Sequence, residues 1–215
     1  MIAKGILFDF DGVVVKSMEQ HFAAWQKAFA EKGVQITPDD FFPLEGQGIY
    51  TISQKIGREH GLSDAEIDQV RERKVNYYNQ FMTIEFYDYF TDLLKHLHTR
   101  QVPMGIVTGG TRQRVTKIVE QYFDHYFSAI VTVDDVRKGK PHPDPFLKGA
   151  ELLGLPARNC VVVENAPLGI KGARAAGMTV IGITTTLPAE QLKEAHYVAN
   201  DFQEVEKILL RLLKV

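Results

Sequence analysis

The chain has 215 residues, of which 45% are hydrophobic and 24% charged, and its formal net charge at pH 7 is −2. This length and composition allow a full hydrophobic core in one large domain or two small ones. Acidic and basic residues are interleaved, which leaves no basic stripe for a nucleic-acid backbone, and no apolar run approaches the ~18 residues of a membrane-spanning helix. We therefore expect a cytoplasmic, monomeric protein that binds a small molecule and neither nucleic acid nor membrane.

Short apolar runs alternate with helical periodicity over most of the chain. The apolar run at residues 4–9 predicts a first strand, and helical periodicity from about residue 202 predicts the last helix. Short strands separated by helical stretches of about 10–15 residues are typical of parallel βαβ units with right-handed crossovers. The sequence therefore predicts an α/β fold on a parallel sheet. Its later strands are expected at 102–108, 128–133, 159–164 and 178–183.

A long helical segment follows the first predicted strand. Residues 17–82 show helical periodicity, and two capping-box signatures, Ser17 with Gln20 and Ser63 with Glu66, predict helix starts within them. This segment is too long for a single crossover, so we predict an all-helical cap inserted into the α/β core. The predicted ranges are 16–84 for the cap, and 1–15 with 85–215 for the core.

Polar residues follow the carboxyl ends of four predicted strands. Ligands of open parallel sheets bind at this edge, so we expect these residues to converge. Asp9 and Asp11 are two residues apart on an extended strand, and their carboxylates therefore lie on one side of the sheet edge. The other strand ends carry Thr108 with Gly109 and Gly110, Lys140 after the third strand, and Glu164 with Asn165.

The pair of Asp9 and Asp11 indicates a divalent cation. Crowded carboxylates repel each other unless protons or a cation lie between them, and oxygen ligands without clustered cysteine or histidine favour Mg²⁺. A nearby threonine hydroxyl, a lysine and glycine N–H groups suit a phosphoryl group. Asp9 would attack phosphorus to give an aspartyl-phosphate. Asp11 would protonate the leaving oxygen and later deprotonate the attacking water.

Four segments of the chain resemble the motifs of the haloacid dehalogenase superfamily. In order, they are "FDFDGVVVKS", "GIVTGG", "KGKPHPDPF" and "VVVENAPLGIKGARAAGM". The resemblance spans nearly the whole chain and implies a Rossmann-like core, a bound Mg²⁺, Asp9 as nucleophile and Asp11 as acid and base. It also implies phosphate contacts for Thr108 and Lys140. Around the metal we expect Asp9, the backbone carbonyl of Asp11 and the uncharged amide oxygen of Asn165, with Glu164 holding metal-bound water or Lys140.

Residues of the cap bear on the substrate. The segment "SMEQHFAAW", with His21, is similar to the β-phosphoglucomutase branch, whereas "LEGQG", "VTGG" and "ENAPLG" look closer to an inorganic pyrophosphatase of the superfamily. Ile49 stands where the mutase pattern carries a cap arginine, and the nearest cationic candidates are Arg73 and Lys74. Glu45 would repel a bare phosphate unless Mg²⁺ lay between them, which favours metal-complexed pyrophosphate. His21, Glu45 and Lys74 are thus predicted to contact substrate, together with Gly109 and Gly110.

The most favoured function is a magnesium-dependent phosphohydrolase that acts through an aspartyl-phosphate on a small, sugar phosphate-like metabolite. The alternatives are an inorganic pyrophosphatase and a β-phosphoglucomutase-type phosphomutase, the latter disfavoured by the missing cap arginine. A non-catalytic phosphate-binding module is the least favoured alternative, because Asp9 and Asp11 are both intact. The cap decides among these functions, since it supplies the contacts to the leaving group.

Overall fold

Six strands form one parallel sheet within residues 3–213, the part of the chain that the computed structural model describes. The strand order is β3-β2-β1-β4-β5-β6, which places β1 in the interior of the sheet, between β2 and β4. The predicted α/β fold on a parallel sheet is confirmed. The strands are β1 (Gly5–Phe8), β2 (Met104–Val107), β3 (Ala129–Val131), β4 (Cys160–Glu164), β5 (Thr179–Ile183) and β6 (Tyr197–Ala199).

The edge strand β6 was missing from the predicted elements. It has three residues, of which Tyr197 and Val198 are exposed. It therefore lacks the buried apolar run by which the other strands were predicted, and only its pairing with β5 makes it a strand.

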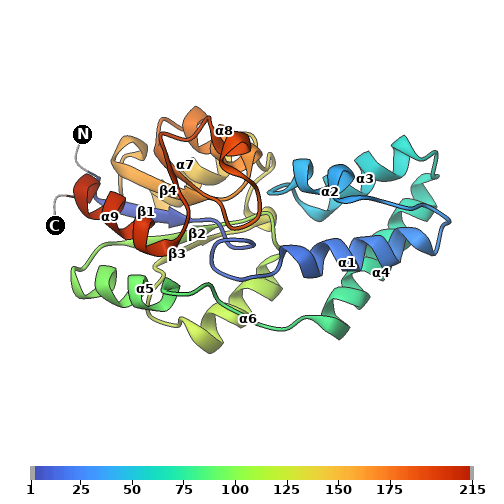
Figure 1. Cartoon of the computed structure of the whole chain (residues 1–215), viewed down its shortest axis with the longest axis horizontal. Helices are drawn as coiled ribbons and strands as arrows, with labels where there is room; N and C mark the ends of the chain where they lie inside the picture. Colours follow the sequence, from blue (N-terminus) through green and yellow to red (C-terminus); the bar gives the residue numbers. More distant parts are fainter. Residues whose placement is uncertain (1–2, 214–215) are drawn as a thin grey trace.

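Helices cover both faces of the sheet (Figure 1). Along β1, Ile6 and Phe8 point to one face and Leu7 to the other, and all three are fully buried. Ile6 and Phe8 pack with α5, α6 and α9, whereas Leu7 packs with α7 and α8. The helices on the two faces of the sheet are α5 (Phe90–Thr99), α6 (Arg112–Tyr122), α7 (Asp144–Leu152), α8 (Pro167–Ala175) and α9 (Phe202–Leu213).

No helix in residues 3–213 is both long and apolar enough to cross a membrane.

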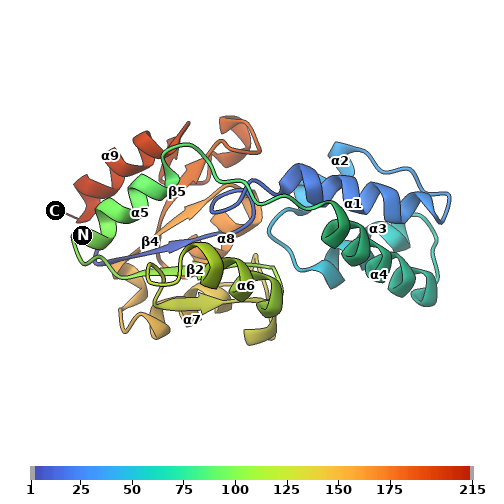
Figure 2. The ribbon, with the colours of Figure 1, turned by 90° about the horizontal axis from the view of Figure 1, so that it is seen from below.

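Four further helices pack together beside the sheet, and two chain segments connect them to it (Figure 2). Trp25 and Phe29 lie with Ile56 and Val70 in a hydrophobic cluster separate from the two cores of the sheet. Burial of each large apolar side chain stabilises this group by roughly 1.5–3 kcal/mol. The helices are α1 (Met18–Ala30), α2 (Pro38–Phe41), α3 (Ile49–Glu59) and α4 (Asp64–Phe81). Short 3₁₀ helices are η1 (Phe42–Leu44), η2 (Val133–Asp135), η3 (Ala157–Asn159) and η4 (Ala189–Leu192).

The two predicted capping boxes have different outcomes. The box at the start of α4 forms as expected. Ser17 precedes α1 but makes no capping hydrogen bond, and its hydroxyl donates instead to Asp11 Oδ1 at 2.5 Å. The Gln20 side chain donates to the Thr83 carbonyl oxygen at 3.1 Å and so joins the two connecting segments. The capping prediction for Ser17 and Gln20 was wrong because both side chains have tertiary partners.

Candidate functional site

A buried ammonium group links the carboxyl ends of β1 and β4. Lys140 Nζ donates to Asp9 Oδ1 at 2.6 Å and to Glu164 Oε2 at 2.7 Å. Burial disfavours the ammonium, yet the two carboxylates raise the pKa of Lys140 above its ordinary value, so it stays charged. Burial and the neighbouring Glu164 raise the pKa of Asp9 to about 7, against the opposite effect of Lys140. One ammonium therefore leaves the two carboxylates incompletely neutralised.

Glu45 reaches from the helical group to the end of β4. Asn165 Nδ2 donates to Glu45 Oε1 and, at 2.9 Å, to Thr186 Oγ1. The Thr186 hydroxyl lies 3.2 Å from both oxygens of Glu45. Burial raises the pKa of Glu45 well above its ordinary value, and the charges of Asp9 and Glu164 add to the shift. A third carboxylate thus crowds the same region.

This surplus of negative charge fits a divalent cation. Lys140 pairs with Asp9 and Glu164, and the charges of these two residues also raise the pKa of Glu45, so a cation would relieve the repulsion among the three. Asn165 Oδ1 is buried and has no hydrogen-bond partner among the described residues. An uncharged oxygen is thus available beside the carboxylates, and an all-oxygen donor set suits Mg²⁺.

The individual donors differ in availability. Glu164 Oε1 accepts the N–H groups of Asn165 and Ala166 at 3.0 and 3.1 Å, and its Oε2 accepts from Lys140, so its side chain is already engaged. Within residues 3–213 no three His, Cys, Asp or Glu side chains gather as a metal site. The expected donors are of mixed type, since Asp9 offers a carboxylate, Asp11 a backbone carbonyl and Asn165 an amide.

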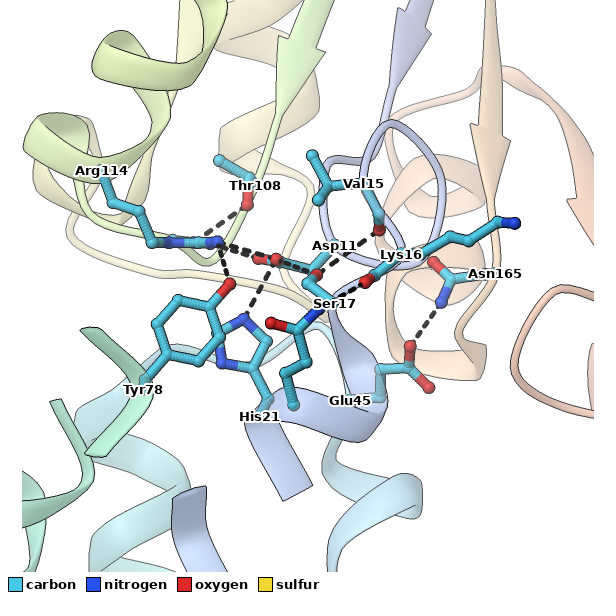
Figure 3. Close-up of polar contacts among 12 residues, drawn as sticks. Asp11, Val15, Lys16, Ser17, His21, Glu45, Tyr78, Thr108, Arg114 and Asn165 are labelled. Carbon is cyan, nitrogen blue, oxygen red and sulfur yellow. Dashed lines mark hydrogen bonds and ion pairs between the residues drawn. The ribbon is translucent and has the colours of Figure 1, made fainter. Parts of the chain in front are cut away.

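Three side chains from different segments hold the carboxylate of Asp11 (Figure 3). Ser17 donates to it from the connection after β1, and His21 Nε2 of α1 lies 3.0 Å from Oδ1. Arg114 of α6 binds both oxygens, with Nη1 2.9 Å from Oδ1 and Nη2 on Oδ2. Burial alone would raise the pKa of Asp11, but Arg114 and His21 hold it well below its ordinary value. With its side chain engaged, Asp11 has only its carbonyl to offer a metal.

His21 of α1 packs against two residues of α4. Its ring stacks on Tyr78 with centroids 4.1 Å apart, and its Nδ1 lies 2.9 Å from Lys74 Nζ. Burial and the charge of Lys74 lower the pKa of His21 to about 3, so the ring is neutral. With Lys74 donating to Nδ1, the ring proton is on Nε2 and is donated to Asp11. Burial and the charge of Arg114 lower the pKa of Lys74 to about 7.

A cavity of about 670 Å³ lies between the sheet edge and the helical group. At its sheet side, Thr108 Oγ1 accepts the Gly110 N–H at 2.9 Å. A Cβ atom on Gly109 would lie 2.9 Å from the Gly46 carbonyl oxygen, so the loop before α3 contacts the end of β2 closely. Eight predicted site residues line the cavity: Asp9, Asp11, His21, Glu45, Lys74, Thr108, Gly109 and Gly110. The other three, Lys140, Glu164 and Asn165, contact this lining through Asp9 and Glu45.

The sequence interpretation missed four polar residues of the site: Ser17, Tyr78, Arg114 and Thr186. Thr186 was open to prediction, because it follows the fifth strand as the other site residues follow theirs. Arg114 could not be predicted from the sequence, because Arg112 on the same helix is an equally good candidate for a site arginine. In the structure Arg112 pairs with Asp135 instead.

Known proteins are similar to this chain in sequence and in structure. The family model described as haloacid dehalogenase-like hydrolase matches residues 6–183. The fructose-1-phosphate phosphatase YqaB of Escherichia coli is 31% identical over 187 residues, which are 83% of this chain and 95% of the relative. The pyrophosphatase PpaX of Oceanobacillus iheyensis is 26% identical over 213 residues, which are 97% of this chain and 98% of the relative. A solved structure from Bacteroides vulgatus, provisionally described as a beta-phosphoglucomutase, has a TM-score of 0.89 at 26% identity and covers 100% of this chain and 91% of its own.

Proposed function

The chain belongs to the haloacid dehalogenase-like hydrolases, and on that premise we propose that it is a magnesium-dependent phosphatase acting through an aspartyl-phosphate on Asp9. Its substrate is a small phosphorylated metabolite of the sugar phosphate class. The observation that carries the proposal is the position of Asp9, which is buried, hydrogen-bonded to Lys140 and part of the cavity lining. The fructose-1-phosphate phosphatase relative supports the substrate class.

The reaction has two steps. An oxygen of Asp9 forms a bond to phosphorus while the bond from phosphorus to the leaving oxygen breaks. Asp11, which must first take up a proton against the effect of Arg114 and His21, gives that proton to the leaving oxygen. Water then attacks phosphorus, Asp11 takes up its proton, and phosphate leaves as the Asp9 carboxylate is restored. Lys140, bound to Asp9 Oδ1 at 2.6 Å, orients the nucleophile and offsets phosphoryl charge.

Asp9, Asn165 and the carbonyl oxygen of Asp11 would hold Mg²⁺, which when bound would neutralise charge on the phosphoryl oxygens. Glu164 supports this arrangement by fixing Lys140 at 2.7 Å. The Thr108 hydroxyl and the N–H group of Gly109 would donate to the phosphoryl oxygens, while the Gly110 N–H orients the Thr108 hydroxyl. Each of these groups acts at the carboxyl edge of the sheet.

A pyrophosphatase is the second candidate, because Glu45 is buried beside the amide of Asn165. A carboxylate there tolerates a metal-complexed diphosphate better than a bare phosphate. The similarity to the pyrophosphatase PpaX favours the same candidate. The mutase is disfavoured, because Ile49 lines the cavity where the mutase pattern carries an arginine.

A substrate panel tests the proposal. Phosphate release is measured with Mg²⁺ and with EDTA from fructose 1-phosphate, glucose 6-phosphate, nucleoside monophosphates and pyrophosphate, alongside conversion of glucose 1-phosphate. We expect Mg²⁺-dependent release with the highest kcat/KM on a sugar phosphate. A higher kcat/KM on pyrophosphate would favour the second candidate. Isomerisation of glucose 1-phosphate without phosphate release would identify a mutase.

A further inference from the structure

The two ends of the cavity differ in charge. On the side of Asp9 and Glu45, carboxylates exceed cations, as described above for the proposed metal site. On the side of Asp11, the cavity lining includes Arg114, which pairs with Asp11, together with Lys74 and Lys117. The proposed Mg²⁺ would neutralise the negative side, around Asp9 and Glu45. No ligand has been proposed so far for the positive side, around Arg114.

Arg114 is the central cation of the positive side, and its fork is only partly used. Two of its hydrogen bonds go to Asp11 and one, from Nη1 at 3.3 Å, goes to the Tyr78 hydroxyl. A guanidinium has five N–H donors, so two remain without a partner among the described residues. The side chain is 15% exposed, which is enough for contact with a molecule in the cavity. Arg114 therefore can bind Asp11 and a second anion together.

Gly110 makes room for this guanidinium. A Cβ atom at position 110 would lie 2.5 Å from Arg114 Nη2, closer than side chains pack. Any other residue at position 110 would require the guanidinium to shift. The loop after β2 thus leaves space for the Arg114 guanidinium in the cavity lining.

We infer that Arg114 binds a carboxylate on the leaving-group side of the substrate and so sets the substrate class. This rests on the proposed function, in which Asp11 contacts the leaving oxygen. Because Arg114 binds Asp11 through both of its oxygens, it lies on the leaving-group side of the reaction. A carboxylate has the two-oxygen geometry that a pair of arginine N–H donors recognises, and Asp11 and Tyr78 leave two such donors of Arg114 available.

Lys74 and Lys117 extend the same positive side. Lys117 follows Arg114 by one helical turn on α6, and Lys74 faces them from α4. Lys74 has no carboxylate within salt-bridge distance in the described part of the chain, since its Nζ lies against His21 and two aromatic rings. An acidic leaving group would meet three cationic side chains there. A neutral sugar would give Lys74 and Lys117 no anionic partner, while Arg114 would keep its pair with Asp11.

Binding measurements on an inactive background test the inference apart from catalysis. The full chain carrying Asp9→Asn is titrated calorimetrically, with Mg²⁺ present, with two matched pairs of ligands. Glycerol 3-phosphate and 3-phosphoglycerate differ in having a hydroxymethyl group or a carboxylate, as do sorbitol 6-phosphate and 6-phosphogluconate on a longer open chain. The same titrations are made after adding Arg114→Gln, Arg114→Lys or, as a charge-matched control on the same helix, Arg112→Gln. Arg112 pairs with Asp135 and is not part of the cavity lining.

We expect at least one ligand with a carboxylate to bind about tenfold or more tightly than its partner without one. Arg114→Gln should reduce that preference to less than about threefold, Arg114→Lys should keep part of it because it keeps the charge, and Arg112→Gln should leave it unchanged. The inference is overturned if neither pair shows a preference, or if the preference survives Arg114→Gln. Melting curves confirm that each variant is folded. Failure of the proposed function is a separate result, namely no phosphate release by the wild-type chain from any member of the substrate panel.

Discussion

Replacing Asn165 by aspartate tests how charge is balanced at the end of β4. The Asn165 amino group donates to the buried Glu45 carboxylate and to Thr186. Aspartate would replace this donor with a carboxylate facing Glu45. Two unit charges about 4 Å apart repel by about 4 kcal/mol at an effective dielectric constant of about 20. The lost hydrogen bond to a charged group adds about 1.5–3 kcal/mol, while proton uptake by Glu45 relieves part of the repulsion.

We therefore expect metal-free Asn165→Asp to lose about 3 kcal/mol of unfolding free energy, or about 6–12 °C in Tm for a chain of this size. A more negative site binds a cation more tightly, so Mg²⁺ should raise the Tm of Asn165→Asp by more than it raises that of the wild type. Asn165→Ala lacks the amide oxygen and should respond less to Mg²⁺ than the wild type. Thermal melts in EDTA and in a Mg²⁺ series measure all three.

Asn200 provides a matched control. Its Nδ2 also donates to a glutamate, Glu204 Oε2, at 3.1 Å, but this pair is exposed to solvent. Water screens the charges there, so Asn200→Asp should cost less than about 1 kcal/mol. Equal losses for the two variants in EDTA would refute the reasoning about buried charge. An unchanged Mg²⁺ response in Asn165→Asp and Asn165→Ala would show that Asn165 is not a metal ligand.

Three further predictions concern other residues of the site. Asp9→Asn should abolish phosphate release while far-UV circular dichroism and Tm show an intact fold, because an amide attacks phosphorus poorly; substantial residual turnover would contradict its role as nucleophile. Glu45→Ala should reduce kcat/KM for pyrophosphate at least about tenfold more than for an aryl phosphate, and equal losses would remove the case for pyrophosphate. Burial and the charge of Arg114 lower the pKa of Lys74 to about 7, although Asp11 has the opposite effect. Between about pH 7 and pH 10.5 the folded chain therefore binds fewer protons than the unfolded chain, so stability increases with pH over this range. The destabilisation caused by charged Lys74 is therefore largest below pH 7. Lys74→Met should therefore raise the urea midpoint more at pH 6 than at pH 10, and equal increases would contradict the lowered pKa.

The order of strands and of the residues after them was predictable from the sequence, for a physical reason. In a parallel sheet every carboxyl end meets the same edge, so residues as distant in sequence as Asp9, Lys140 and Glu164 must converge once the strands are recognised. Their hydrogen bonds are the geometry that this rule implies. The same rule, applied to the fifth strand, would also have indicated Thr186.

Tertiary structure alone decided which side chains complete the site. Arg114 reaches Asp11 across 103 positions of sequence, and this contact depends on the rotation of α6 about its axis and on the space left by Gly110. Ser17 has the local signature of a helix cap, yet a stronger acceptor, the Asp11 carboxylate, is brought beside it. The orientation of the Asn165 amide likewise depends on its hydrogen bond to Glu45, a residue of the helical group. Sequence patterns determine local conformation and which face of an element is buried, whereas partners between elements depend on how those elements pack.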